Sequence, residues 1–270
     1  MLRNAGDMKG LTIRATDGEI GMVDHFYFDD ESWVIRYLVV DTGGWLSGLG
    51  STLVLISPYS LGSTDWHARR LNVRLTKQQV AGSPQIDTNE AVSRQHETEH
   101  LSYYGYPRYW VGPYIWGAEY SPLGFVPPAE IPNVPVPSEE DQTPDGINES
   151  DCHLHSTREV HGYAIEAADG EIGHVEDFVV DDETWAVRYL EVATRNWWPG
   201  KKVLVPPAWI YTVSWGDSKV YVDLDREKIR NSPEYLESEP ITRGYEDQLY
   251  LHYGRPPYWL REAENMTTRR

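Results

Sequence analysis

The chain has 270 residues and a formal net charge of -18, with 42 Asp and Glu against 24 Lys and Arg. A nucleic-acid-binding surface needs clustered Lys and Arg, so this balance argues against a DNA or RNA partner. Cys152 is the only cysteine, which excludes an intramolecular disulfide and fits a reducing compartment. The polar amino terminus and the lack of a long apolar run predict neither a signal peptide nor a membrane span, and a cytoplasmic location is expected.

Most of the chain is a duplication. Residues 17–41 and 169–193 align without a gap, and 15 of the 25 positions are identical. The shared letters run D-G-E-I-G, then D-D-E, then W-x-x-R-Y-L-x-V. The offset is 152 residues here and 149 beyond Gly200. We therefore expect two copies of one domain, and any chemistry of the ancestral unit should recur in both.

The first copy predicts about six short strands, which alternate in polarity and are rich in β-branched and aromatic residues. Gly18 supplies the turn between the first two strands, since glycine adopts positive φ without steric cost. Short strands at this spacing indicate a small closed or nearly closed barrel. The expected strands are 11–15, 21–29, 33–41, 52–57, 59–63 and 71–75, and the second copy repeats them.

Each barrel is followed by a short helix and a helical tail. Thr76 is the expected N-cap of a helix over 77–81, with Ser83-Pro84 as its stop, and Asp225 caps its twin. Longer helices are expected over 93–104 and 242–253, ending at Gly105 and Gly254. Both tails then carry aromatic residues, and we interpret the tails as straps that dock on a barrel. These aromatic residues are Tyr106, Tyr109, Trp110, Tyr258 and Trp259.

The domain boundaries follow from the repeat and from a Pro-rich, acidic segment between the copies. Residues 122–144 hold seven prolines and few large aliphatic residues, which is typical of an extended linker. We expect a first domain with its tail over 1–118, a linker over 119–156, a second domain with its tail over 157–262, and a disordered end over 263–270.

The string D-G-E-I-G-H-V-E-D-F, followed by D-D-E-T-W-x-x-R-Y-L and W-W-P-G-K-K-V-L-V-P-P, resembles the PRC-barrel family. That family is named after the cytoplasmic domain of the photosynthetic reaction-centre H subunit. The resemblance covers about 10–75 and 162–224 and implies a mainly β fold of two tandem six-stranded barrels. It also implies adaptor or assembly work without established catalytic residues. The first copy departs from the pattern at 45–51, opposite 197–202, so the two loops are where separate tasks are expected.

One motif matches a known catalytic pattern. His96-Glu97-Thr98-Glu99-His100 has the H-E-x-x-H spacing of zinc proteases, which sets two histidines on one helix face with a glutamate as base. The second copy has Tyr245 to Leu249 at these positions, and no third ligand is placed downstream. We interpret the motif as a solvated helical face rather than a metal site.

Two further clusters have candidate metal ligands. Cys152-His153-Leu154-His155, with His161 nearby, has no counterpart in the first copy, and we interpret it as a disordered linker end. The acidic turns at 29–31 and 181–183 recur, but they lack the spacing of a calcium loop, so charged hairpin turns are expected. We predict no cofactor, no metal site and no catalytic residue.

The tryptophan, arginine and tyrosine of the repeated W-x-x-R-Y-L run have two interpretations. They pack in the barrel core or in the contact between the copies, or they form a recognition surface, because such residues anchor interfaces. The favoured function is a non-enzymatic protein that acts in protein interaction, complex assembly or a stress-linked adaptor role, with an unknown protein partner. The copies are expected to pack as an intramolecular pseudo-dimer, and a homo-oligomer is open. A photosynthetic accessory role and a metal- or small-ligand-binding role are the alternatives. The candidate interaction surface comprises Trp33, Arg36, Tyr37, Tyr109, Trp110, Trp185, Arg188, Tyr189, Trp197, Trp198, Tyr258 and Trp259.

Overall fold

The computed structural model describes residues 1–46, 52–84, 92–125, 152–194, 201–260 and 262–263. The chain is mainly β, as predicted, with two seven-stranded sheets and short helices. Two compact units can be distinguished. The first holds Met1, Arg3–Val160 and the hairpin Phe178–Arg188, and the second holds Leu2, His161–Asp177 and Tyr189–Arg270.

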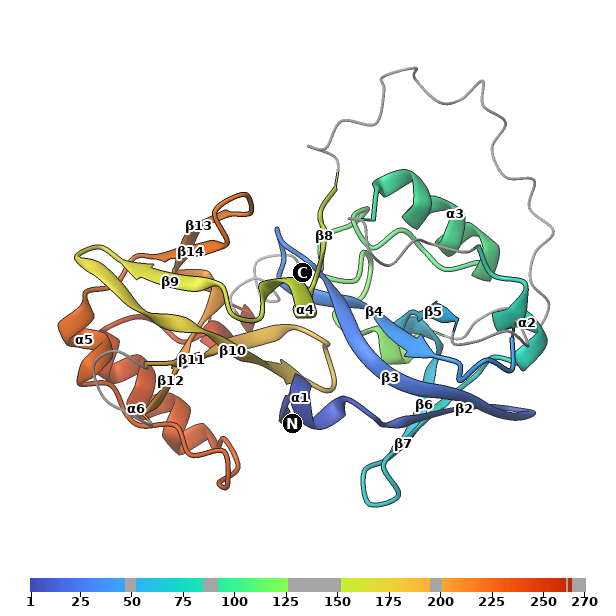
Figure 1. Cartoon of the computed structure of the whole chain (residues 1–270), viewed down its shortest axis with the longest axis horizontal. Helices are drawn as coiled ribbons and strands as arrows, with labels where there is room; N and C mark the ends of the chain where they lie inside the picture. The colour runs from blue at the N-terminus through green and yellow to red at the C-terminus, as the bar shows by residue number, and fades with distance from the viewer. Residues whose placement is uncertain (47–51, 85–91, 126–151, 195–200, 261, 264–270) are drawn as a thin grey trace. The chain divides into compact units, whose positions relative to one another are not determined.

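The first sheet is built around a long, buried hairpin of β3 and β4 (Figure 1). Pairing is antiparallel except between β2 and β7, which run parallel. Its order is β5 (Leu53–Ile56), β4 (Val34–Asp41), β3 (Gly18–Asp29), β2 (Thr12–Ala15), β7 (Arg70–Val73) and β6 (Leu61–Asp65), with β8 (Leu154–Ser156) added on β3. Five of the predicted strands are confirmed. The sixth was expected from residue 59 and starts at Leu61, because Pro58–Ser60 form a 3-10 turn.

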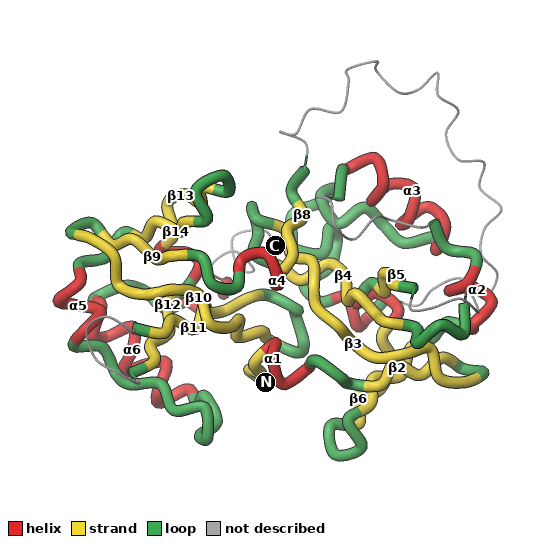
Figure 2. The backbone as a smooth tube through the Cα atoms, in the orientation of Figure 1, coloured by secondary structure: helices red, strands yellow, loops and turns green. Residues whose placement is uncertain are grey.

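The second sheet repeats this order (Figure 2). Its strands are β12 (Lys202–Val205), β11 (Val187–Ala193), β10 (Gly170–Asp181), β9 (Ala164–Ala167), β14 (Lys219–Val222) and β13 (Ile210–Ser214), with β1 (Leu2–Asn4) added on β10. Here β9 and β14 form the parallel pair. The repeated sequence therefore folds into repeated strand topology.

The predicted short helices are α2 (Lys77–Ala81) and α5 (Arg226–Arg230). Thr76 caps α2 in a capping box with Gln79, as expected. Asp225 stands at the N-cap of α5 but makes no side-chain capping bond, which corrects that expectation. In both units, the aspartate of the shared D-G-E-I-G turn accepts a hydrogen bond from the first N–H of the short helix: Asp17 accepts the Lys77 N–H and Asp169 accepts the Arg226 N–H, each at 2.8 Å.

The tail helices are α3 (Arg94–Tyr104) and α6 (Arg243–Tyr253); both end as predicted and begin one residue after the predicted start. Ser93 and Thr242 accept hydrogen bonds from the N–H groups of the first turn. Gly105 and Gly254 end the helices with φ of 68° and 66°, a left-handed conformation that favours glycine.

The last glycine of D-G-E-I-G is required because the long strand and the end of its hairpin partner approach closely there. A Cβ on Gly21 would lie 1.9 Å from the Asp41 carbonyl oxygen, and one on Gly173 would lie 2.0 Å from the Ala193 oxygen. The register of the β2 and β3 pair and that of β9 and β10 both shift beside these glycines. The glycine is therefore needed where the long strand bends.

The elements that open each copy were not predicted. The segments are β1 followed by α1 (Ala5–Met8), and β8 followed by α4 (Thr157–Val160). We expected 152–155 to be the disordered end of a linker, and this is wrong for the described part, because Leu154 is fully buried and β8 pairs with β3. A strand of three residues has too short a pattern to stand out in a sequence.

Candidate interaction site

The H-E-x-x-H segment lies on α3 with its outer residues in different environments. His96 is exposed, while Glu97 and His100 are fully buried. The expected solvated helical face is therefore wrong for two of the three motif residues. A metal shared by His96 and His100 would require one ligand in solvent and the other in the core. Within the described ranges, no three His, Cys, Asp or Glu side chains gather so as to hold a metal ion.

Glu97 is the centre of a buried polar cluster. Its carboxylate accepts a hydrogen bond from the Tyr109 hydroxyl and pairs with Arg94 at 3.1 Å. The Arg94 guanidinium lies 4.4 Å from the ring centroid of Trp110. Burial raises the pKa of Glu97 to about 7, against the lowering effect of Arg94 and Tyr109. The cluster joins α3 to the tail that follows it.

The second unit repeats this cluster at an offset of 149 residues. Arg243 pairs with Glu246 at 3.1 Å, and the Tyr258 hydroxyl donates to Glu246 at 3.1 Å. The Arg243 guanidinium lies 3.9 Å from the Trp259 centroid. The metal-ligand motif does not include the arginine, tyrosine and tryptophan of this cluster. The repeat itself would have revealed it, because Glu97 aligns with Glu246 and Arg94 with Arg243.

His100 is held as a neutral core residue. Its Nε2 lies 3.2 Å from the Leu55 carbonyl oxygen, so the neutral ring donates there. Its ring packs edge-on against Tyr37 with centroids 5.0 Å apart. Burial lowers the pKa of His100 to about 4. The imidazole therefore links α3 to β5.

The acidic turns are structural, as the charged-turn interpretation predicted. The Asp29 carboxylate accepts the N–H groups of Glu31 and Ser32 at 3.1 and 2.9 Å. Asp181 accepts the Glu183 N–H at 3.1 Å, so the second turn is closed in the same way. The following Trp33 adopts a φ of 54°, at the end of this turn.

The second aspartate of each turn faces a basic or titratable side chain of the added strand. Asp30 lies 3.5 Å from His153 and 3.5 Å from His155. Asp182 accepts a hydrogen bond from Arg3 at 2.6 Å. In the first unit, the histidines of the Cys152–His155 segment thus have carboxylate partners and hold β8 on β3.

Most of the candidate interaction residues are buried and therefore do not form a solvent-facing surface, which corrects that expectation. The relative exposures are at most 9% for Trp33, Arg36, Tyr37, Tyr109, Trp185, Arg188 and Tyr189. Trp110, Tyr258 and Trp259 are half-buried, and Trp197 and Trp198 lie outside the described residues, as does most of each divergent loop. The core-closing interpretation of the repeated aromatic residues agrees with this burial.

The buried Arg36 of β4 binds the first tail. Its guanidinium donates to the Ile115 carbonyl at 2.6 Å and lies 3.7 Å from the centroid of Tyr109. Beyond it, the buried Trp116 indole donates to the Thr184 carbonyl at 2.7 Å. The tail over 109–121 therefore docks as a strap inside the first unit, on the hairpin Phe178–Arg188.

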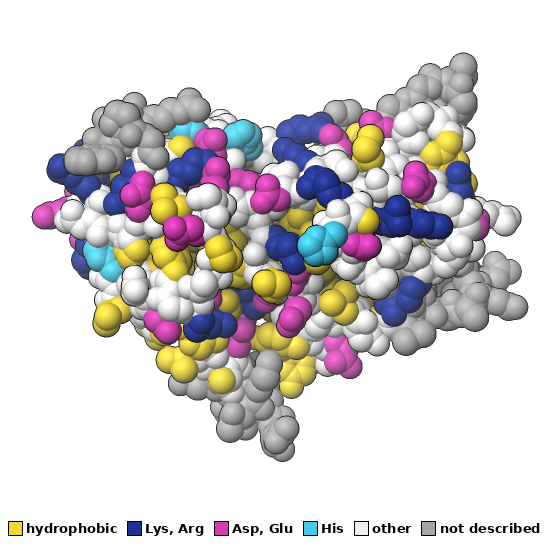
Figure 3. All heavy atoms as spheres, turned by 90° about the horizontal axis from the view of Figure 1, so that it is seen from below, with side chains coloured by type: hydrophobic (Ala, Val, Ile, Leu, Met, Phe, Trp, Pro, Cys, Tyr) yellow, Lys and Arg dark blue, Asp and Glu magenta, His cyan; other side chains and the backbone are white. Residues whose placement is uncertain are grey.

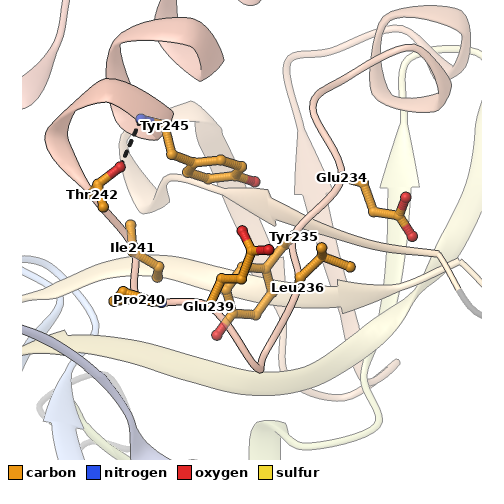
Figure 4. A pocket seen from close by; sticks show the side chains of 8 residues that line it. All are labelled: Glu234, Tyr235, Leu236, Glu239, Pro240, Ile241, Thr242 and Tyr245. Carbon is orange, nitrogen blue, oxygen red and sulfur yellow. Dashed lines mark hydrogen bonds between the residues drawn. The ribbon is translucent and has the colours of Figure 1, made fainter.

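An open groove lies in the second unit, in the loop that leads into α6 (Figure 4). It has a volume of about 210 Å³. Its lining residues are Glu234, Tyr235, Leu236, Glu239, Pro240, Ile241, Thr242 and Tyr245. Leu236 is 46% exposed, which is high for a large apolar side chain beside other apolar groups. The lining holds two carboxylates and no basic residue.

The loop carrying the groove is fixed at several points. The Tyr235 N–H donates to the Lys202 carbonyl of β12 at 3.0 Å, and the Tyr245 hydroxyl donates to the Pro233 carbonyl at 3.4 Å. The Lys202 ammonium pairs with the fully buried Glu191 at 2.6 Å and also with Glu237 of the loop. Burial raises the pKa of Glu191, whereas the bond to Lys202 lowers that of Glu237. A shared lysine therefore anchors the loop.

The face shown in Figure 3 is mixed in charge. On the face shown in Figure 3, Lys and Arg side chains lie among acidic and apolar ones, so this face presents no continuous field of one sign. Among the helices that the structure describes, none combines the length and apolar character needed to cross a membrane.

Comparison with known proteins identifies a domain family. The sequence profile of the PRC-barrel domain matches residues 2–80 and 156–229, which together make up more than half of the chain. Both matched segments begin close to the added strands β1 and β8 and include all but the last residue of the short helices α2 and α5. No curated protein matches the chain.

Proposed function

The chain belongs to the PRC-barrel domain family through two tandem copies, and we propose that it is a non-enzymatic assembly protein that binds other proteins through the groove before α6. The observation that carries this proposal is the exposed Leu236 in an open, fixed groove of the second unit. An apolar recess with a polar rim is typical of a site for another molecule.

The repeated polar clusters support a structural role for the rest of the repeat. Glu97 and Glu246 are buried, and each is engaged by an arginine of its own helix and a tyrosine of the tail that follows that helix. A catalytic acid or base needs access to a substrate proton, and these carboxylates are directed instead to the tails. The duplicated chemistry therefore serves to dock the tails, and we assign no catalytic residue.

We also infer that the repeat descends from a self-pairing domain, as expected of a pseudo-dimer. Within the first unit, Val34 and Ala186 hold the same position of the repeat and form an antiparallel bridge with each other. The Ile35 N–H donates to the Trp185 carbonyl at 2.8 Å, and the Val187 N–H donates to the Trp33 carbonyl at 2.7 Å. Equal and reciprocal contacts are the mark of a twofold interface.

Affinity purification tests the assembly function. The full chain, tagged and expressed in its native cells, would be crosslinked before lysis and its partners quantified by mass spectrometry against the tag alone. We expect a reproducible set of co-purified proteins, from the cytoplasmic fraction that the single cysteine favours. Recovery of the tagged chain without any reproducible partner would contradict the proposal.

A further inference from the structure

The two units differ at one position of the repeat that lies beside the groove. Val92 and Ile241 both stand directly before the residue that caps a tail helix. Val92 is 1% exposed and forms an antiparallel bridge with Leu154 of β8. Ile241 is half-buried, forms no such bridge, and makes no backbone hydrogen bond with any residue that the structure describes.

The first unit shows which kind of segment this backbone accepts. Leu154 lies extended between His153 and His155, and it packs with Val92 and Leu55 in one buried apolar cluster. The two histidines face the carboxylate of Asp30, each at 3.5 Å. The apolar side chain of Leu154 therefore covers the Val92 position, and the histidines on either side of it are directed to Asp30 at the end of β3.

The groove at Ile241 has the complementary features. Leu236, Pro240 and the Tyr245 ring supply apolar walls, and Glu234 and Glu239 are exposed at its lining. No lining residue carries a positive charge. Free backbone groups beside an apolar recess are the usual requirement for adding a strand, in which main-chain bonds give affinity and side-chain pockets give specificity.

We propose that this groove binds an extended segment of a partner protein, in which an apolar side chain is flanked by Lys or Arg, by pairing with the backbone of Ile241. The inference rests on the proposed assembly function and names the chemistry of its partner. The apolar side chain fills the recess beside Leu236, and the flanking cations meet Glu234 and Glu239.

Peptide binding to the full chain provides the test. The probe is the fluorescein-labelled peptide Gly-Ser-Arg-Val-Leu-Val-Arg-Ser-Gly, measured by fluorescence anisotropy. The comparison peptides have Glu in place of Arg, Ser in place of the three apolar residues, or an N-methyl group on the central Leu, which removes a backbone donor. We expect each change to weaken binding at least about tenfold, the size of effect typical of an interface anchor.

Variants of the chain locate the binding. Leu236→Asp and the double change Glu234→Lys with Glu239→Lys should each weaken binding at least about tenfold. Leu251→Asp is the matched control, since Leu251 is 82% exposed on α6 and does not line the groove; it should leave binding unchanged. Equal binding of the acidic peptide, or full binding by Leu236→Asp, would overturn the inference.

The same variant separates this inference from the assembly function. If Leu236→Asp loses the peptide and also loses partners in the crosslinking experiment, both proposals stand. If the variant recovers the same partners as the unchanged chain, the chain still acts in assembly, but the groove is not its binding site and the present inference falls. If neither protein recovers a partner, the assembly function itself fails.

Discussion

Glu97 and Glu246 hold the same position of the repeat, and each is a buried carboxylate paired at 3.1 Å with the arginine three residues before it. Each also accepts a hydrogen bond from a tyrosine of the tail that follows its helix. The pair explains why both copies keep an aromatic ending after Gly105 and Gly254. These tails are held by a charged, desolvated cluster as well as by apolar packing.

The first prediction concerns the pH dependence of stability at Glu97. Burial raises the pKa of Glu97 from 4.5 to about 7, so its contribution to the free energy of unfolding is complete below pH 4.5 and is lost as the pH rises through 7. Glu97→Gln should flatten the decline between these values by about 1–3 kcal/mol. Urea unfolding at a series of pH values measures this. The control is Glu99→Gln on the same helix, and an equal slope in both variants would contradict the assignment.

The opposite sign is expected at His100. Burial lowers the pKa of His100 from 6.5 to about 4, so its stabilising contribution is complete above pH 6.5 and is lost as the pH falls through 4. His100→Gln should reduce the acid loss in this window, although the altered core packing lowers stability at neutral pH. His96→Gln changes the exposed histidine of the same motif and should leave the pH profile unaltered. Thermal unfolding of both variants between pH 4 and 7 distinguishes them.

A third prediction uses the equivalent tyrosines of β4 and β11. The Tyr189 hydroxyl donates to Glu246 at 2.8 Å, whereas the buried Tyr37 hydroxyl has no hydrogen-bond partner among the described residues. Tyr189→Phe should cost about 1.5–3 kcal/mol, because a hydrogen bond to a charged group is removed. Tyr37→Phe should be neutral or slightly stabilising. Chemical denaturation compares the two, and equal losses would show that the hydroxyl of Tyr37 is engaged.

The fourth prediction concerns the bend of the long strand. Gly173→Ala would place a Cβ 2.0 Å from the Ala193 oxygen, at a φ of 151°, and Gly21→Ala would place one 1.9 Å from the Asp41 oxygen. The backbone carbonyl can move away only if the strand distorts, so each change should lower the free energy of unfolding by about 2–4 kcal/mol. Gly216→Ala meets no atom within 4 Å and serves as control. Both glycine variants matching this control in a thermal melt would contradict the close approach.

The sequence alone was sufficient for the features that depend on local chemistry and on the repeat. Thr76, Ser93 and Thr242 begin their helices, and Gly105 and Gly254 end them, because caps and positive φ values are local requirements. The mainly β class and the tandem copies followed from alternating strands and the shared W-x-x-R-Y-L run.

Only the tertiary structure decided what the side chains at a distance do. The polar surroundings of Glu97 and His100 suggested solvent, but the fold buries Glu97 against Tyr109 of the tail and His100 against β5, which lies 45 residues earlier in the chain. The short β8 could be recognised only from its pairing with β3. Val92 and Ile241 hold the same position of the repeat. Among the described residues, β8 covers Val92 and no strand covers Ile241, and this difference suggests a binding site. Burial and strand pairing are properties of contacts between remote segments, and a local pattern does not contain them.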